Sequence, residues 1–166
     1  MEVQNQKTKY IVRMKTCIGL FFILTLLVSS CQDGYFFEKN IDIPNQSWEY
    51  KNKPAFEVQI TDKNVKFDVY VNLRHNAYYP FSNIYLLLHE KGKGLKDTAY
   101  RHEIKLAELD GRWTGRSAGN LYEQSVLIKE SYSFPDTGKY KFSIEQNMRE
   151  NPLHGVNDVG LKLIKK

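Results

Sequence analysis

The sequence predicts an all-β fold, a single antiparallel β-sandwich of about seven or eight strands that is immunoglobulin-like or jelly-roll-like. Short segments alternate apolar and polar residues with a period of two, which is typical of strands that bury one face. Clusters of Gly, Pro, Asn and Asp separate these segments. No segment carries a long apolar stripe at helical spacing. These patterns favour two packed sheets over a helical or mixed fold.

The first 30 residues predict a cleaved lipoprotein signal peptide. A largely apolar run at 17–28 has the length of a signal-peptide core rather than of a membrane-spanning helix. Ser29 and Ser30 then precede Cys31, as in a lipobox. The basic residues before the run are Lys7, Lys9, Arg13 and Lys15. We expect cleavage before Cys31 and acyl chains on its thiol, which would anchor the protein to the membrane. The alternative is an uncleaved transmembrane anchor.

Residues 31–53 are expected to form the lipidated N-terminus and a tether, and residues 54–166 the β-sandwich domain. The segment before residue 54 is polar with scattered aromatic residues, and Ile43-Pro44-Asn45 resembles a turn. Aromatic side chains such as Trp48 and Tyr50 are expected to lay the later part of the tether onto the domain, as an edge strand.

Two alternating segments open the domain. Residues 55–60 place Phe56, Val58 and Ile60 on one face, and residues 67–73 repeat the pattern. Phe67, Val69, Val71 and Leu73 share one face of the second segment, with Asp68, Tyr70 and Asn72 on the other. Because only the polar turn at 62–64 separates the two segments, we expect a hairpin.

The remaining strands are expected at 82–90, 98–107, 123–130, 139–146 and 157–164. The nearly continuous apolar run at 82–90 favours a central strand buried on both faces. Side chains expected to point inward from the later strands are Tyr100, His102, Ile104, Leu106, Tyr140, Phe142, Ile144, Val159, Leu161 and Leu163. Residues 145–154 leave the pattern, and Pro152 cannot occupy a central ladder position, so we expect a long ordered connection there.

Composition excludes several function classes for the mature chain. Cys17 lies in the leader and Cys31 is used for acylation, so neither a disulfide nor a cysteine-based metal site can form. The four histidines show no metal-binding spacing, and we predict neither metal nor cofactor. The leader carries four of the 24 basic residues and one of the 19 acidic ones, which lowers the formal charge from +5 to +2 after cleavage. Nucleic acid is therefore not an expected partner.

The sequence offers no recognisable cysteine- or histidine-based catalytic set. After acylation of Cys31 it has no cysteine nucleophile, and its four histidines are set in no recognisable motif. We predict no catalytic residues and no enzymatic activity.

Two turns supply candidate interaction residues. In Asp110-Gly111-Arg112-Trp113-Thr114-Gly115, Arg112 and Trp113 could form an exposed anchor pair, or Trp113 could plug the end of the sandwich while the glycines take positive φ values. We favour the plug. Tyr79 lies in the Tyr78-Tyr79-Pro80-Phe81 turn, and Arg74 ends the strand before it.

Arg74 could have one of two roles. It could form a buried ion pair with Glu145 or Asp158, which we favour, or face a glycan or a protein from the surface. Glu145 and Arg149 carry the same ambiguity. The 11 tyrosines and two tryptophans could line a carbohydrate platform, so glycan binding is the second function hypothesis.

Three clusters of residues resemble the gliding-motility lipoprotein GldH family. They are Asn72-Leu73-Arg74-His75-Asn76 with Tyr79-Pro80-Phe81-Ser82-Asn83; Leu109-Asp110-Gly111-Arg112-Trp113-Thr114-Gly115 followed by Gly119; and Phe134-Pro135, Gly138-Lys139-Tyr140, Phe142-Ser143-Ile144-Glu145-Gln146, Met148-Arg149, Pro152-Leu153, Gly155 and Asp158-Val159-Gly160-Leu161. The resemblance covers essentially the whole mature chain.

The resemblance implies an outer-membrane lipoprotein needed by a cell-surface gliding apparatus, working beside other lipoproteins and the type IX export machinery. We expect a non-enzymatic docking component, held in the membrane by acyl chains on Cys31 and contacting envelope proteins. A single acid follows Cys31 in Gln32-Asp33-Gly34, which favours the periplasmic face of the outer membrane.

Overall fold

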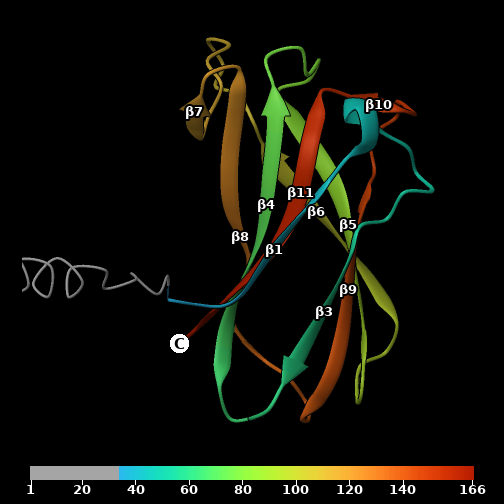
Figure 1. Ribbon diagram of the computed structural model, residues 1–166, viewed down its shortest axis with the longest axis vertical. Coiled ribbons are helices and arrows are strands. Elements are labelled where there is room, and N and C mark those ends of the chain that lie inside the picture. Colours follow the sequence, from blue (N-terminus) through green and yellow to red (C-terminus); the bar gives the residue numbers. More distant parts are fainter. Residues whose placement is uncertain (1–33) are drawn as a thin grey trace, which may run out of the picture. The chain divides into compact units, whose positions relative to one another are not determined.

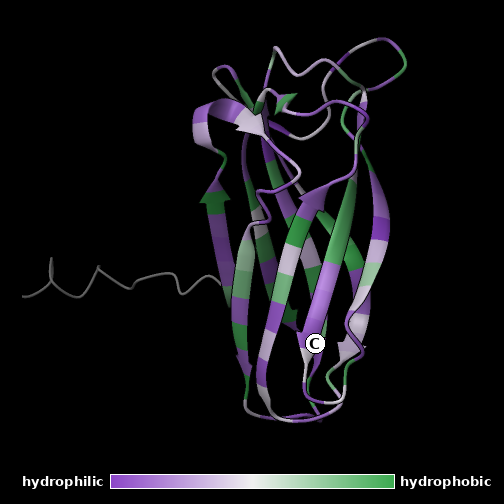
Figure 2. Ribbon diagram, turned by 90° about the vertical axis from the view of Figure 1, so that its right-hand side faces the viewer, coloured by the Kyte–Doolittle hydropathy of each residue, from purple (hydrophilic) through white to green (hydrophobic). Residues whose placement is uncertain are grey.

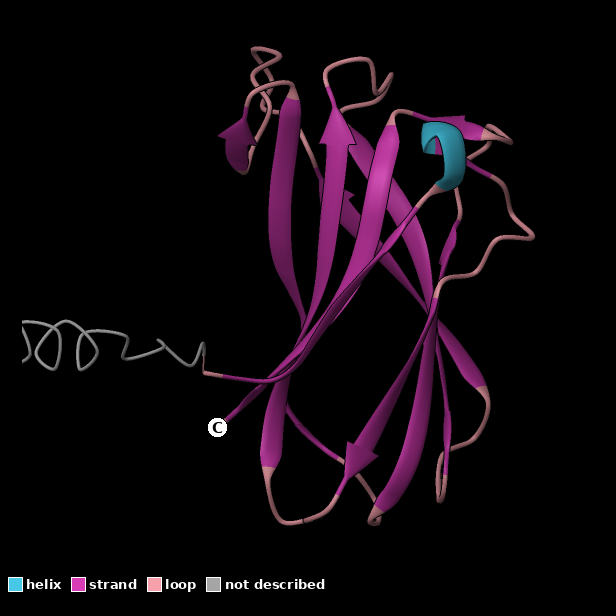
Figure 3. Cartoon of the chain, in the orientation of Figure 1, coloured by secondary structure: helices cyan, strands magenta, loops and turns pink. Residues whose placement is uncertain are grey.

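The computed structural model describes residues 34–166 and confirms an all-β sandwich (Figures 1 and 3). Eleven antiparallel strands form three sheets in the described residues, and the only helix among them is the short 3₁₀ turn η1, Pro44–Gln46. No helix in this part of the chain is long and apolar enough to cross a membrane. The expected signal peptide and Cys31 lie outside the described residues.

The larger sheet has five strands in the order β1-β11-β4-β8-β7. Their bounds are β1 Tyr35–Asp42, β11 Val156–Lys165, β4 Lys66–Asn76, β8 Leu121–Ser133 and β7 Arg116–Ala118. β1 and the short β7 form the two edges, and β4 is paired along its length with β11 and β8. The first and last strands of the chain therefore lie side by side (Figure 1).

The second sheet has four strands in the order β3-β9-β5-β6. Their bounds are β3 Ala55–Ile60, β9 Gly138–Gln146, β5 Asn83–Gly92 and β6 Thr98–Lys105. A two-stranded ribbon of β2, Ser47–Trp48, and β10, Leu153–His154, ties the segment after β1 to the connection between β9 and β11.

The core lies between the two larger sheets. The alternation is visible in Figure 2 as hydrophobic and hydrophilic bands along the strands. The side chains expected to point inward from 139–146 and 157–164 are all buried, which confirms that part of the prediction. The largest fully buried side chain is that of Trp48, whose indole Nε1 donates a hydrogen bond to the carbonyl oxygen of Asn52 at 2.7 Å.

The predicted hairpin of the first two alternating segments is wrong. β3 pairs with β9 in one sheet, whereas β4 pairs with β11 and β8 in the other. The turn at 62–64 therefore carries the chain across the core between the sheets. A period of two shows which face of a strand is buried, but both sheets bury their inner faces in the same core, so the pattern cannot identify the pairing partner.

Two expectations of burial also differ from the structure. β5 is central in its sheet, but only its inner face is buried and its outer face is half-buried. In β6, Ile104 is buried as expected, and so is Leu106 directly after the strand, but His102 is half-buried and Tyr100 is 45% exposed. β6 is an edge strand, and Tyr100 near its start contacts the opposite sheet only partly, with its ring centroid 4.5 Å from Lys129 Nζ of β8.

The first strand of the described residues begins earlier in the chain than the sequence suggested. β1 begins at Tyr35 and pairs with β11 through Asp42, within the 31–53 range expected to begin as a tether.

The seven strand segments expected from residue 55 onward correspond to β3, β4, β5, β6, β8, β9 and β11. The additional short strands β2, β7 and β10 have two or three residues each, too few for an alternating pattern to mark.

Several loops share one end of the sandwich. Asn76 at the end of β4 pairs with Leu121 at the start of β8, and Asn83 at the start of β5 pairs with Lys105 at the end of β6. The loops 77–82 and 106–115 therefore lie at the same end. We call these two loops the loop end of the domain. β1 runs toward this end, since Asp42 pairs with Asp158, which in turn pairs with Arg74.

Candidate functional site

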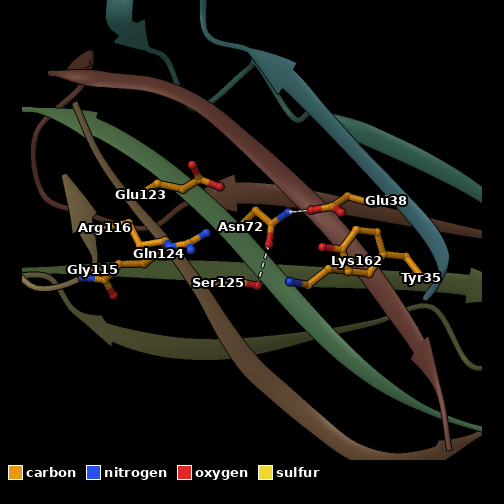
Figure 4. A pocket seen from close by; sticks show the side chains of 9 residues that line it. All are labelled: Tyr35, Glu38, Asn72, Gly115, Arg116, Glu123, Gln124, Ser125 and Lys162. Atoms are coloured by element: carbon orange, nitrogen blue, oxygen red, sulfur yellow. Dashed lines mark hydrogen bonds between the residues drawn. The ribbon is translucent and has the colours of Figure 1, made fainter. Parts of the chain in front are cut away.

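A polar groove crosses the outer face of the five-stranded sheet (Figure 4). Its volume is about 430 Å³, and all four of its charged side chains come from different strands. We call it the sheet groove. It is lined by Tyr35, Glu38, Asn72, Gly115, Arg116, Glu123, Gln124, Ser125 and Lys162.

A hydrogen-bonded network forms the floor of the sheet groove. Asn72 is 3% exposed and accepts a hydrogen bond from Ser125 Oγ at 2.8 Å. Its amide nitrogen donates to Glu38 Oε1 at 2.7 Å and to Asn40 Oδ1 at 3.2 Å, so side chains of β8, β4 and β1 are linked. Gly160 of β11 lies between Asn40 and Asn72 in the register, and a Cβ there would overlap the Asn40 side chain. The glycine leaves room for the network to cross β11.

The walls of the sheet groove carry charged side chains. Within residues 34–166, no ion pair within 4.0 Å involves Arg116, Glu123 or Lys162. Gly115, with φ +90°, lets the segment before β7 approach the backbone of Glu123 closely, because a Cβ would overlap that carbonyl oxygen. On the other side, the Lys162 ammonium lies 5.3 Å from the ring centroid of Tyr35.

The predicted ion pair of Arg74 lies beside the sheet groove, two residues further along β4 than Asn72. Arg74 Nε donates to Asp158 Oδ2 at 2.5 Å, and the Asp158 side chain is 3% exposed. Burial raises the pKa of the Asp158 carboxyl, and the charges of Asp42 and Glu123 add to this, while Arg74 opposes it. Arg74 is therefore the main stabiliser of the ionised carboxylate, and the pair ties β4 to β11.

Glu145 lies on the outer face of the other sheet and does not meet Arg74. Its carboxylate contacts Lys53 Nζ at 2.7 Å and His89 Nε2 at 2.9 Å. Burial alone would raise the pKa of Glu145, but the hydrogen bonds and charges of Lys53 and His89 outweigh that effect and lower it. These contacts attach the segment before β3 to β9 and β5.

Trp113 and Tyr79 belong to an aromatic cluster beneath the loop end. Trp113 is half-buried and its ring centroid lies 4.6 Å from that of His75 and 6.4 Å from that of Tyr79. Tyr122 stacks on His75 with the centroids 5.5 Å apart. Gly111 and Gly115 have positive φ values, as the plug interpretation of Trp113 requires. The geometry supports packing for Trp113 rather than an exposed anchor.

Burial has a direct consequence for His75. The side chain is fully buried, and its Nδ1 lies 3.0 Å from the carbonyl oxygen of Asn76. Burial lowers the pKa of the imidazole, and the bond to Asn76 opposes this only in part. Burial also raises the pKa of the Tyr79 hydroxyl, which donates to the carbonyl oxygen of Asn83 at 2.9 Å.

The tips of the loop end are exposed. Tyr78 is 87% exposed, and Leu109 is fully exposed. The Arg112 side chain is 77% exposed and pairs with Asp110 of its own turn at 2.8 Å. The loops are joined at Ser82, whose carbonyl oxygen accepts hydrogen bonds from the backbone of residues 106 and 107. Arg149 is exposed in the connection after β9.

Two groups of residues were not predicted as sites. The polar face of β4 was recognised from its alternation, but its alignment with Glu38, Arg116 and Lys162 depends on strand order, which the sequence does not show. The second group is a buried ion pair across the two sheets. Lys129 Nζ lies 2.5 Å from Glu90 Oε1, with the Glu90 side chain 4% exposed.

Comparison with known proteins identifies the family of this chain. The family model for the GldH lipoprotein matches residues 35–163, from the first residue of β1 into β11. The chain belongs to the GldH lipoprotein family. The matched region is therefore the β-sandwich itself, including the sheet groove and the loop end.

Two GldH relatives align over nearly their whole length. A protein of Christiangramia forsetii named gliding motility lipoprotein GldH homolog is 30% identical over 164 residues, which covers 93% of this chain and 98% of the relative. The gliding motility lipoprotein GldH of Flavobacterium johnsoniae is 27% identical over 155 residues, which covers 89% of this chain and 96% of the relative.

Proposed function

We propose that this GldH family member is a lipid-anchored, non-enzymatic docking component of the gliding machinery, associated with type IX secretion. The names of the two relatives support a role in gliding motility. A docking role is supported by the exposed side chains at the loop end, and this observation carries the proposal.

The anchor would hold the sandwich close to the membrane. Cys31 precedes Gly34 by three positions, and β1 begins at Tyr35. We place the acyl chains on Cys31 and the protein on the periplasmic face of the outer membrane, since Asp33 is the only acid directly after the lipobox. A short connection of this kind suits a protein that presents one end to a partner.

The loop end would be that presenting surface. β1 has eight residues and runs from Tyr35 toward the loop end, a length of about 26 Å. Tyr78, Leu109 and Arg112 would therefore face away from the membrane. An aromatic, an aliphatic and an arginine side chain supply the chemistry that dominates protein–protein contacts.

Affinity purification of the anchored protein after crosslinking in living cells, followed by mass spectrometry, tests this proposal. We expect gliding or type IX export components to be enriched. A matched purification of a Tyr78→Ser, Leu109→Ser double variant should lose them while keeping the protein in the membrane. Recovery of no motility or export component with the unaltered protein would contradict the proposal.

A further inference from the structure

We propose that the sheet groove binds a neutral oligosaccharide. The inference concerns the outer face of the five-stranded sheet and does not depend on the docking role of the loop end. It follows from the charges, the donors and acceptors, and the shape of the groove.

The charge balance of the groove selects an uncharged polar ligand. Arg116 and Lys162 supply two positive charges, and Glu38 and Glu123 supply two negative ones. An anionic ligand would meet the two carboxylates, and a cationic ligand would meet the guanidinium and ammonium groups. A purely apolar ligand would desolvate all four charges without replacing their hydrogen bonds. A neutral ligand rich in hydroxyl groups avoids each of these costs.

Hydroxyl groups also match the polar inventory of the groove. Each sugar hydroxyl can donate to a carboxylate such as Glu123 and accept from a guanidinium such as that of Arg116. Neither of these two side chains is held in an ion pair among residues 34–166, so both are available to a ligand. Gln124 and Ser125 also line the groove along β8 (Figure 4). Ser125 Oγ donates to Asn72 and Gln124 Nε2 donates to Thr114 Oγ1, so the oxygens of both side chains remain as acceptors for a ligand.

The floor of the groove is organised before any ligand arrives. Asn72 is held by Glu38, Asn40 and Ser125, so its orientation requires no adjustment on binding. A fixed floor reduces the ordering cost that a flexible polar surface would pay. The groove volume of about 430 Å³ falls in the range of small-molecule sites, and Tyr35, 44% exposed, adds an aromatic ring at the rim.

Binding of the full-length acylated protein in detergent to an array of immobilised neutral, acidic and basic oligosaccharides tests the proposal. We expect binding to neutral members, weakened at least tenfold by Arg116→Ala and by Glu123→Ala. Both side chains are exposed, so the variants should fold normally, which circular dichroism would verify. Lys63→Ala, in the exposed turn at 62–64, is the matched control and should bind as the unaltered protein does.

The array includes neutral chains from lipopolysaccharide and from extracellular polysaccharide, so that a positive result also identifies the source. Binding to none of the neutral saccharides would overturn the proposal. So would binding that survives both groove substitutions, or preference for acidic saccharides or for peptides spotted on the same surface.

Discussion

Asp158 shows how a single residue ties the larger sheet together at the cost of a buried charge. The side chain is almost fully buried, and its ion-pair partner is Arg74, whose side chain is 40% exposed. The sequence suggested an ion pair for Arg74 with either Asp158 or Glu145. It could not choose between them, because the choice depends on β11, rather than β9, lying beside β4.

Arg74→Ala is expected to lower the free energy of unfolding at pH 7 by about 2 kcal/mol, because the Asp158 carboxylate would remain buried without its partner. The loss should shrink as the pH falls, since a carboxyl whose pKa is raised in the folded state takes up a proton there first. Denaturant titration at pH 7 and pH 4 measures both effects. Arg112→Ala removes an exposed pair and should leave stability unchanged; equal losses in the two variants would contradict the account.

His75 makes stability depend on pH near neutrality. Its pKa is lowered from 6.5 in the folded protein, so the unfolded chain binds more protons below pH 6.5 and stability falls as the pH falls. The slope should approach about 1.4 kcal/mol per pH unit for this one histidine. His75→Phe keeps an aromatic ring beside Trp113 and should flatten the curve measured by urea titration between pH 7 and 5. The exposed His154→Gln is the control; a slope that His75→Phe leaves intact would refute the prediction.

At the scale of elements, β1 is the long strand that the sequence pattern did not locate. Sequence alternation located the long strands, because each buries one regular face. It missed β1, whose outward residues Glu38, Asn40 and Asp42 are polar and whose aromatic residues cluster at the start. β1 is held by pairing with β11 and by the polar network over Gly160, and neither feature can be recognised before the strand order is known.

Gly160→Ala tests this element directly. The added Cβ would overlap the Asn40 side chain, and the β1 backbone would also be close, at 2.9 Å from the Lys39 carbonyl oxygen. We expect a loss of about 1–3 kcal/mol in unfolding free energy and faster amide hydrogen exchange in residues 35–42. Gly34→Ala, with no neighbour within 4 Å, should change neither quantity. Unchanged exchange in β1 of the Gly160 variant would show that the close approach is not required.

At the scale of the whole molecule, β1 begins at the end of the sandwich opposite the loop end, since Tyr35 pairs with Ile164 and Ile164 with Asp68. Fold class and family resemblance were accessible from the sequence because alternation, turn residues and short motifs are local. The sheet groove and the loop end were not, because they unite residues from β1, β4, β7, β8 and β11, or from loops nearly 30 positions apart.

Cys31→Ala should remove the anchor without affecting the fold, since Cys31 lies before the first strand. Labelling of cells with radioactive palmitate should mark the unaltered protein and not the variant. Fractionation should move the variant from the membrane to the soluble fraction. A variant that stayed in the membrane would rule out the lipobox interpretation.

Docking through the loop end is the central claim, and site-specific photo-crosslinking in gliding cells tests it most directly. A photoreactive residue would replace Tyr78 at the loop end or, as the matched position, the exposed Lys63 in the turn at the opposite end. The account predicts crosslinks from position 78 to a motility or type IX component and none from position 63. The same crosslinks from both positions, or none from position 78, would contradict it.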